Sequence, residues 1–361
     1  MEQTLYLVLE NGRVFKGKGF GAEGEVTGEV VFSTGMTGYL ETLTDPSYYG
    51  QIIVQTFPLI GNYGVIPEDF EKDQTYLRAY VVREWCEEPS NYRCADVLDN
   101  FLKEQNIIGL CGIDTRELTK IIRDHGVMNG KIVRTLDHME QDLQEIKAYR
   151  VQDAVPNTSC KAMFEEKAEN GKYKVALWDL GAKMNISREL LKRGCDVITV
   201  PYNTTAEQVL ALKPDGVMLT NGPGDPADNM DVAQEIAKVV AARVPTFGIC
   251  MGHQLLALSQ GAKTMRLKYG HRGANQPVKD LSSGRVFISS QNHGYAVVSE
   301  SLPQTAHVFF ENANDGTCEG VAYDNVPAFS VQFHPEACAG PHDTAYLFDQ
   351  FIGMMEENKH A

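Results

Sequence analysis

The first third of the chain alternates apolar and polar residues, which is the pattern of half-buried strands. LYLVLENGRVFKGKGFG, residues 5–21, alternates about the turn residues Glu10, Asn11 and Gly12 and predicts a β-hairpin. Three further runs, EVVFS, QIIVQTF and LRAYVV, also predict strands. Together these runs indicate a smaller, sheet-rich α+β domain over residues 1–150.

The clearest helix of this first domain is predicted to begin after Asp114, because D-T-R-E offers Asp114 as N-cap and Glu117 as its capping-box partner. Gly126 is predicted to end it. Residues 151–172 are polar and lack a sustained period, so we expect a linker there.

From residue 173 to residue 361 the pattern changes to apolar runs that alternate with helical periods. KVALWDL, DVITVPY, GVMLTNG and PTFGIC predict strands, while NISRELLKRG, TAEQVLALK, DVAQEIAKVVAARV and HQLLALSQG predict the helices between them. This order predicts an α/β fold with a mostly parallel sheet flanked by helices. RVFISS, HGYAVVS and AFSVQFH predict further strands, and TAYLFDQFIGMMEE predicts a final amphipathic helix.

The charge, the apolar runs and the cysteines of the sequence limit which partners, cellular compartment and metal sites we expect. The net charge is -15, and no basic run occurs, which argues against nucleic acid or an acidic membrane as a partner. The start MEQTLYLVLENG lacks a basic segment followed by an apolar one, and no apolar run is long enough to cross a bilayer, so we expect a cytoplasmic protein. The 8 cysteines form no C-x-x-C motif, so we expect no metal site and no disulfide framework.

Two nucleotide-binding motifs can be set aside. GFGAEG, residues 19–24, matches G-x-G-x-x-G, but the next segment, EVTGEVVF, predicts a strand and not the helix that would hold a pyrophosphate. The sequence contains no G-x-x-x-x-G-K-[ST], so we expect no ATP site and no cofactor in this chain.

The segment G-I-C-M-G has the pattern of a nucleophile elbow with Cys250 in the place of serine, since a strand and a helix meet there at a corner with glycines on both sides. The alternative is a buried cysteine that only fills space. A helix N-terminus alone does not ionise a thiol fully, so a base is needed. His253 lies in the first turn of the same helix, where the helix dipole disfavours a charged imidazole, and we expect it to pack or cap.

His334 is the stronger candidate for that base. Glu336 follows two residues later, and on extended backbone both side chains point to the same side. A carboxylate in that place can hold the imidazole tautomer and stabilise its charge, as in Ser-His-Asp sites. The alternative is a polar turn after a strand.

An oxyanion formed in this site needs hydrogen-bond donors. In TNGPGDP the prolines have no N–H, which leaves Gly222, Gly224 and Asp225, and we expect Gly224 to act with the N–H of Met251. Gln254 stands one helical turn after Cys250. QNHGYA is expected to form a turn between strands, and it adds three candidates for ligand binding: Asn292, Gly294 and Tyr295. The alternatives are a simple Gly-Pro turn, an exposed helical glutamine and an ordinary hairpin turn.

NGPGDP, GICMGHQLLA, SSQNHGYAV and FSVQFHPEA together resemble the motifs of the class I (triad) glutamine amidotransferases. FSTGMTGYLETLTDPSYYGQIIVQTFPLIGNYG, GIDTRELTKIIRDHG, YGHRGANQPVKDL and EACAGPHD resemble more narrowly the small, glutamine-hydrolysing subunit of carbamoyl phosphate synthetase. The resemblance covers nearly the whole chain.

The resemblance implies roles for particular residues. Cys250 would attack the side-chain amide of glutamine, His334 would transfer protons, Glu336 would orient His334, and a glutamyl thioester would form and be hydrolysed. Residues matched to the family's glutamine-binding motifs are Ser47, Gly222, Gly224, Met251, Gln254, Asn292, Gly294 and Tyr295.

The resemblance also implies a partner. Ammonia would pass to a large synthetase subunit, which would bind ATP and Mg²⁺ and make carbamoyl phosphate for arginine or pyrimidine biosynthesis, and the N-terminal domain would dock on it. Three alternatives stay open: an amidotransferase subunit for anthranilate, aminodeoxychorismate or GMP synthesis, a stand-alone γ-glutamyl hydrolase, and a non-catalytic binding relative.

Overall fold

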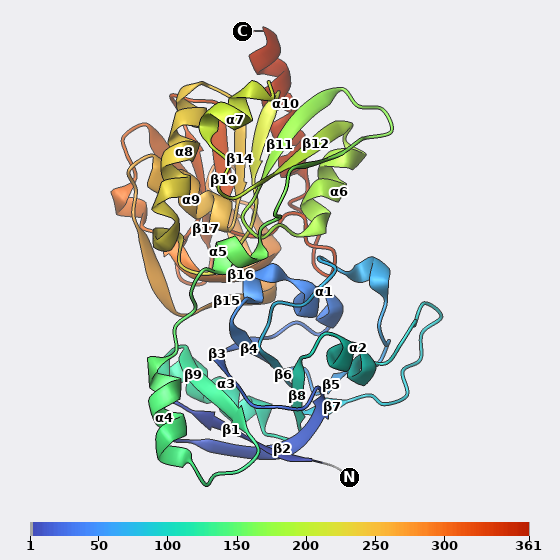
Figure 1. Cartoon of the computed structure of the whole chain (residues 1–361). Helices are drawn as coiled ribbons and strands as arrows, with labels where there is room; N and C mark the ends of the chain where they lie inside the picture. Colours follow the sequence, from blue (N-terminus) through green and yellow to red (C-terminus); the bar gives the residue numbers. More distant parts are fainter. Residues whose placement is uncertain (1–2, 361) are drawn as a thin grey trace. The chain divides into compact units, whose positions relative to one another are not determined.

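The computed structural model describes residues 3–360 and divides into two compact units, Met1–Gln152 and Asp153–Ala361 (Figure 1). Each unit is described by itself. No helix in the described part of the chain is both long and apolar enough to cross a membrane.

The first unit is built on a closed barrel with the strand order β1-β2-β8-β6-β4-β3-β9. The predicted hairpin is confirmed, because β1 and β2 pair antiparallel with Leu7 opposite Phe15. The barrel strands are β1 (Thr4–Leu9), β2 (Val14–Gly21), β3 (Val26–Ser33), β4 (Gln51–Gln55), β6 (Ala79–Val81), β8 (Ile108–Cys111) and β9 (Met128–Val133). β5 (Leu59–Ile60) and β7 (Glu84–Trp85) form a separate two-stranded sheet.

Alternate residues of the barrel strands pack in two different apolar clusters, as the period of two requires. Val30 of β3 packs in the cluster that includes Leu118 of α3, and its neighbour Val31 packs in the cluster that includes Leu40 of α1. The helices of this unit are α1 (Tyr39–Thr44), α2 (Leu98–Glu104), α3 (Thr115–His125) and α4 (Met139–Ala148), with the short 3₁₀ helices η1 (Pro46–Tyr48) and η2 (Pro67–Asp69).

Two details of the first unit answer predictions from the sequence. Asp114 is the N-cap of α3, and its side chain accepts the N–H of Glu117 at 2.9 Å, as predicted. The Glu117 carboxylate does not close a capping box, because it forms an ion pair with Arg13 instead. After GFGAEG the chain enters strand β3 and not a helix, which confirms the strand predicted for that segment.

The second unit contains a 10-stranded sheet with the order β10-β12-β11-β13-β14-β19-β18-β17-β15-β16. The central strands from β12 to β19 pair in parallel, which confirms the α/β prediction, whereas β10 and the strands from β18 to β16 pair antiparallel. The strands are β10 (Phe164–Glu166), β11 (Tyr173–Asp179), β12 (Cys195–Pro201), β13 (Gly216–Leu219), β14 (Thr246–Ile249), β15 (Thr264–Asp280), β16 (Val286–Val297), β17 (Ala306–Asn312), β18 (Cys318–Tyr323) and β19 (Ala328–Val331).

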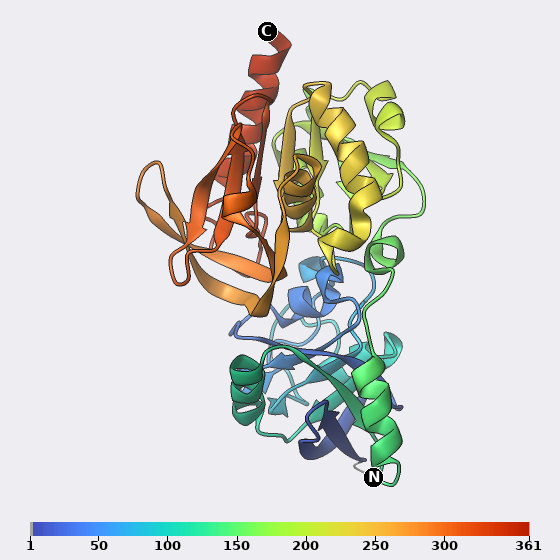
Figure 2. The same ribbon diagram turned by 90° about the vertical axis from the view of Figure 1, so that its left-hand side faces the viewer.

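Helices cover both faces of the parallel part of this sheet (Figure 2). Val175 and Leu177 of β11 pack in one apolar cluster and Ala176 and Trp178 in the other, so the central strand is buried on both sides. The cluster of Trp178 includes residues of α7 (Ala206–Ala211), α8 (Met230–Ala241) and α9 (Met251–Ser259), and the cluster of Leu177 includes residues of α6 (Met184–Lys192) and α10 (Tyr346–His360).

Two segments differ from the sequence-based expectation. Residues 151–172, expected as a linker, contain α5 (Ala154–Thr158) and the edge strand β10, which pairs with β12. The turn expected at QNHGYA is wrong, because strand β16 runs unbroken through it. The pairing of β16 with β15 shifts register at Gly294, between His293 and Tyr295, and this long-range pairing keeps the backbone extended.

Candidate active site

Cys250 occupies a sharp corner between β14 and α9. Its backbone angles, φ 54° and ψ -103°, are strained for a residue with a side chain, and the N–H of Cys250 donates to the Val331 carbonyl at 2.9 Å. The glycines on both sides permit close packing. A Cβ on Gly252 would lie 2.3 Å from the Leu219 carbonyl oxygen, and one on Gly248 would lie 2.8 Å from the Gly252 backbone. The corner therefore requires glycine at both positions.

His334 lies beside this corner because of the sheet order. β14 and β19 are parallel neighbours with Ile249 paired to Val331, so the residues that follow the two strands meet at the same edge of the sheet. The His334 N–H donates to the Ser290 carbonyl at 2.9 Å, which fixes its backbone to β16.

The imidazole of His334 is 1% exposed, and its Nδ1 lies 2.6 Å from Oε1 of Glu336. Its Nε2 is buried and makes no hydrogen bond of normal geometry, but the ring interacts electrostatically with the sulfur of Cys250. Burial and Lys183 act to lower the pKa of His334, but Glu336 and Cys250 outweigh them and raise it to about 10. Burial acts to raise the pKa of Glu336, and His334 with Lys183 lowers it. The pair is therefore ionised near neutral pH.

Lys183 is a neighbour of this pair that the sequence did not single out. Its Nζ lies 3.5 Å from Nδ1 of His334 and 3.9 Å from Oε1 of Glu336, although lysine side chains are usually solvated. The backbone N–H of Lys183 donates to Oδ1 of Asn221 at 3.0 Å, and the preceding turn is held by the buried carboxylate of Asp179. No local pattern in the sequence marks this lysine, because its place depends on the loop between β11 and α6.

The remaining candidates of the second unit surround the corner on three segments. The Cys250 thiol donates to the backbone carbonyl of Asn292 at 3.8 Å. Nε2 of Gln254 donates to the Tyr295 carbonyl at 3.0 Å and to Oε1 of Gln332 at 2.9 Å, so α9 is bonded to β16 and to the end of β19. Met251 is buried at the start of α9.

The loop after β13 carries Gly222 and Gly224 and lies against the same helix, since the N–H of Gly252 donates to the Thr220 carbonyl at 2.9 Å. Gly224 has φ 90°, a conformation that favours glycine. Gly294 lies on β16, two residues after Asn292.

Two further candidates have structural surroundings of their own. His253 is fully buried, with Nδ1 2.8 Å from the Ser330 hydroxyl, and burial lowers its pKa to about 3, so it stays neutral and packs as expected. Ser47 belongs to the first unit, where its N–H donates to Oδ1 of Asp45 at 2.8 Å at the start of η1. Its assignment to the glutamine site remains a prediction.

Comparison with known protein families matches both units. Residues 7–132 match the family model of the carbamoyl-phosphate synthase small chain, CPSase domain, and residues 176–354 match that of the class-I glutamine amidotransferases. The chain is 52% identical to the carbamoyl phosphate synthase small chain of Clostridium perfringens, over 96% of this chain and 98% of that one. It is 51% identical to that of Bacillus cereus, over 98% and 96% of the two chains.

Comparison with solved structures gives matches that cover about half of this chain. A protein from Thermoplasma acidophilum described as a putative GMP synthase subunit is 23% identical, covers 52% of this chain and 96% of its own, and has a TM-score of 0.47.

Proposed function

Because the chain belongs to the family of carbamoyl phosphate synthase small chains, we propose that it hydrolyses L-glutamine and supplies ammonia to a large synthase subunit, with Cys250 as nucleophile. The resemblance stated from the sequence is thereby confirmed at the level of the family. The observation that supports the catalytic assignment most strongly is the buried His334–Glu336 pair beside the strained corner of Cys250.

The first half of the reaction forms a thioester. The proton of Cys250 resides on His334, whose pKa is raised to about 10 and which is therefore protonated near neutral pH, and the thiolate attacks the side-chain amide carbon of glutamine. Glu336 accepts the Nδ1–H, so Nε2 is the nitrogen that exchanges protons with sulfur and substrate. The backbone N–H groups of Gly224 and Met251 are the expected donors to the oxyanion. His334 then protonates the leaving nitrogen, and ammonia departs.

The second half regenerates the enzyme. His334, now neutral, removes a proton from water, which attacks the thioester carbonyl and releases glutamate and the Cys250 thiolate. We assign the holding of glutamine to Ser47, Gly222, Gly224, Met251, Gln254, Asn292, Gly294 and Tyr295. Lys183 is a positioning residue in this scheme, because its ammonium faces both members of the buried pair.

The experiment compares Cys250→Ala with Cys160→Ala, a control cysteine of the same unit, and measures glutamate release with and without the large subunit. We expect a loss of about 10⁴-fold or more for Cys250→Ala and no comparable loss for the control. Cys250→Ala with full glutaminase activity would contradict the assignment.

Formation of carbamoyl phosphate distinguishes the proposal from its alternatives. Co-purified large subunit should make carbamoyl phosphate from glutamine, bicarbonate and ATP, with ATP and Mg²⁺ bound on that partner. Full glutamine turnover without any partner would instead favour a stand-alone hydrolase.

We assign docking of the partner to the first unit, since the catalytic candidates other than Ser47 lie in the second. The second unit has two apolar clusters of its own, so a chain without residues 1–150 can be tested for binding once circular dichroism shows it folded. Binding retained by that chain would contradict this assignment.

A further inference from the structure

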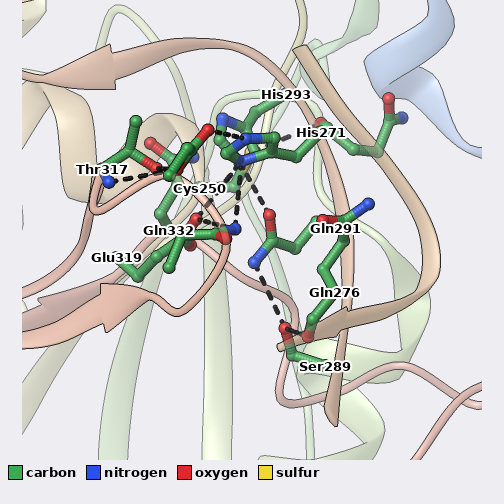
Figure 3. A network of polar contacts seen from close by, with 12 residues as sticks. Cys250, His271, Gln276, Ser289, Gln291, His293, Thr317, Glu319 and Gln332 are labelled. Carbon is green, nitrogen blue, oxygen red and sulfur yellow. Dashed lines mark hydrogen bonds and ion pairs between the residues drawn. The ribbon is translucent and has the colours of Figure 1, made fainter. Parts of the chain in front are cut away.

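Three side chains that could bind a metal ion meet inside the antiparallel part of the second unit's sheet (Figure 3). His271 on β15 and His293 on β16 are cross-strand partners, and their rings lie edge to face with centroids 4.9 Å apart. Glu319 on β18 completes the group, in which one ligand atom from each residue lies within 4.8 Å of the others. All three are buried. The reaction assigned above uses none of their side chains.

Both imidazoles are oriented by a partner on the nitrogen that faces away from the group. Nε2 of His271 lies 2.8 Å from Oδ2 of Asp315, and Nδ1 of His293 lies 2.7 Å from the Tyr295 carbonyl. These acceptors leave Nδ1 of His271 and Nε2 of His293 directed at Glu319. A histidine that ligates a metal almost always donates its other N–H to a carboxylate or a backbone carbonyl in this way.

One donor reaches the group from outside, since Nδ2 of Asn312 donates to Oε1 of Glu319 at 3.2 Å. Oε2 of Glu319 is buried without a hydrogen-bond partner. Nε2 of His293, which carries a lone pair when Nδ1 is protonated, faces Oε1 of Gln291 at 3.1 Å and Oε1 of Glu319 at 3.9 Å, and both atoms are acceptors.

The other neighbour of the Gln291 amide is Ser289. Nε2 of Gln291 donates to the Ser289 hydroxyl at 3.2 Å, and that hydroxyl donates its own hydrogen to the Gln276 carbonyl at 3.0 Å. A reversed amide would require the Ser289 hydroxyl to leave the Gln276 carbonyl and donate to the amide oxygen instead. In the present orientation, Oε1 of Gln291 and Oε1 of Glu319 both face Nε2 of His293, and a cation bound between these buried atoms would accept their lone pairs.

We propose that His271, His293 and Glu319 bind a divalent transition-metal ion of the zinc class, with Oε1 of Gln291 as a fourth donor. Nδ1 of His271 lies 3.3 Å from Oε1 of Glu319, close to the separation of about 3.4 Å between ligands around tetrahedral zinc with bonds of about 2.1 Å. Two imidazoles favour such an ion over Mg²⁺ or Ca²⁺. On binding, His271 keeps its Nε2–H toward Asp315, and any proton on Nδ1 is released to solvent.

The position of the group indicates a structural role for the ion. It would join β15, β16 and β18 directly behind residues 291–295, whose backbone contacts the catalytic corner. The Tyr295 carbonyl that accepts from His293 also accepts from Gln254, and the Asn292 carbonyl accepts from the Cys250 thiol. The sequence predicts no metal site, because the three ligands come from separate strands and form no short motif.

The test is a titration of the full chain with Co²⁺, followed by visible absorption and by the metal retained after desalting. We expect one Co²⁺ per chain with ligand-field bands and without the near-ultraviolet charge-transfer band of thiolate ligands, which excludes binding at Cys250. Glu319→Gln, which keeps the shape of the side chain, should lose the ion. His307→Gln is the matched control, since His307 is a half-exposed histidine of β17 paired with Asp324 outside the group.

A wild-type chain that retains no stoichiometric Co²⁺ overturns the proposal. So does a Glu319→Gln chain with native circular dichroism that binds Co²⁺ as tightly as the wild type. Because Glu319 is fully buried and its variant can fail to fold, Asp315→Asn provides a second measurement at a half-exposed side chain. We expect about 10-fold to 100-fold weaker Co²⁺ binding for Asp315→Asn, and unchanged binding contradicts the orienting role on which the site depends.

Discussion

Gly252→Ala tests whether close packing at the corner of Cys250 controls the reaction. The new Cβ would lie 2.3 Å from the carbonyl oxygen, 2.6 Å from the carbonyl carbon and 2.7 Å from the Cβ of Leu219, whereas ordinary contacts begin at 3.4 Å. Two of these three atoms are backbone, so no side-chain rotation relieves the clash. The start of α9 and the end of β13 must therefore separate by about 1 Å.

This displacement has two measurable consequences. Overpacking of this kind costs about 1–3 kcal/mol of the free energy of unfolding. Gly252 also donates to the Thr220 carbonyl, so the same movement shifts Cys250 relative to the loop of Gly222 and Gly224, and a misplacement of about 1 Å can lower activity about 10²-fold. We expect kcat/KM for glutamine to fall by about that factor, measured as glutamate release.

Gly353→Ala is the matched control, because Gly353 lies inside α10 and a Cβ there would meet no atom within 4 Å. Alanine at that position should raise the free energy of unfolding by about 0.5–1 kcal/mol and leave kcat/KM unchanged. Urea unfolding and initial rates measure both variants side by side. Gly252→Ala with wild-type stability and activity would refute the argument that packing against Leu219 fixes the corner.

Three further predictions concern stability. Asp114→Ala removes the N-cap of α3 and should lower the free energy of unfolding by about 1 kcal/mol in urea, and an unchanged midpoint would contradict the cap. Lys131→Met leaves the Asp142 carboxylate, 2.9 Å from Nζ and 9% exposed, without its cation, so we expect the free energy of unfolding to fall by about 3 kcal/mol. Adding Asp142→Asn should recover part of this loss, and no recovery would contradict an unpaired buried carboxylate as its cause. Burial acts to lower the pKa of His334, but Glu336 helps to raise it from 6.5 to about 10. The protonated His334 therefore stabilises the folded protein fully below pH 6.5, and this stabilisation is lost as the pH rises through 10. Wild-type stability should therefore fall relative to His334→Asn between about pH 7 and pH 10, and parallel pH profiles in urea titrations would count against the ion pair.

The sequence predicts the elements whose causes are local. The β1–β2 hairpin and the N-cap Asp114 follow from patterns within a few residues, and the structure has both. The spacing of His334 and Glu336 was enough to propose their contact, because the two residues are neighbours on extended backbone. Sequence motifs also placed the chain in its family.

What the sequence did not predict depends on pairing between distant segments. The QNHGYA segment was expected to turn, but β15 holds it in a strand through a register that no local pattern records. Lys183 looks like an ordinary solvated lysine until the loop before α6 brings it to the His334–Glu336 pair. The group of His271, His293 and Glu319 likewise exists only because three strands are paired in one register.

The order of strands explains why the candidate site requires the antiparallel part of the sheet. After α9 the chain leaves the parallel sheet, forms β15 to β18, and returns as β19 to pair with β14. The pairing of β19 with β14 places His334 beside Cys250, and β16 places the Asn292 carbonyl against the Cys250 sulfur. The Ser290 carbonyl, which also lies on β16, accepts a hydrogen bond from the His334 N–H. A change that loosens β16 should therefore disturb Cys250 and His334 together, even where it touches neither side chain.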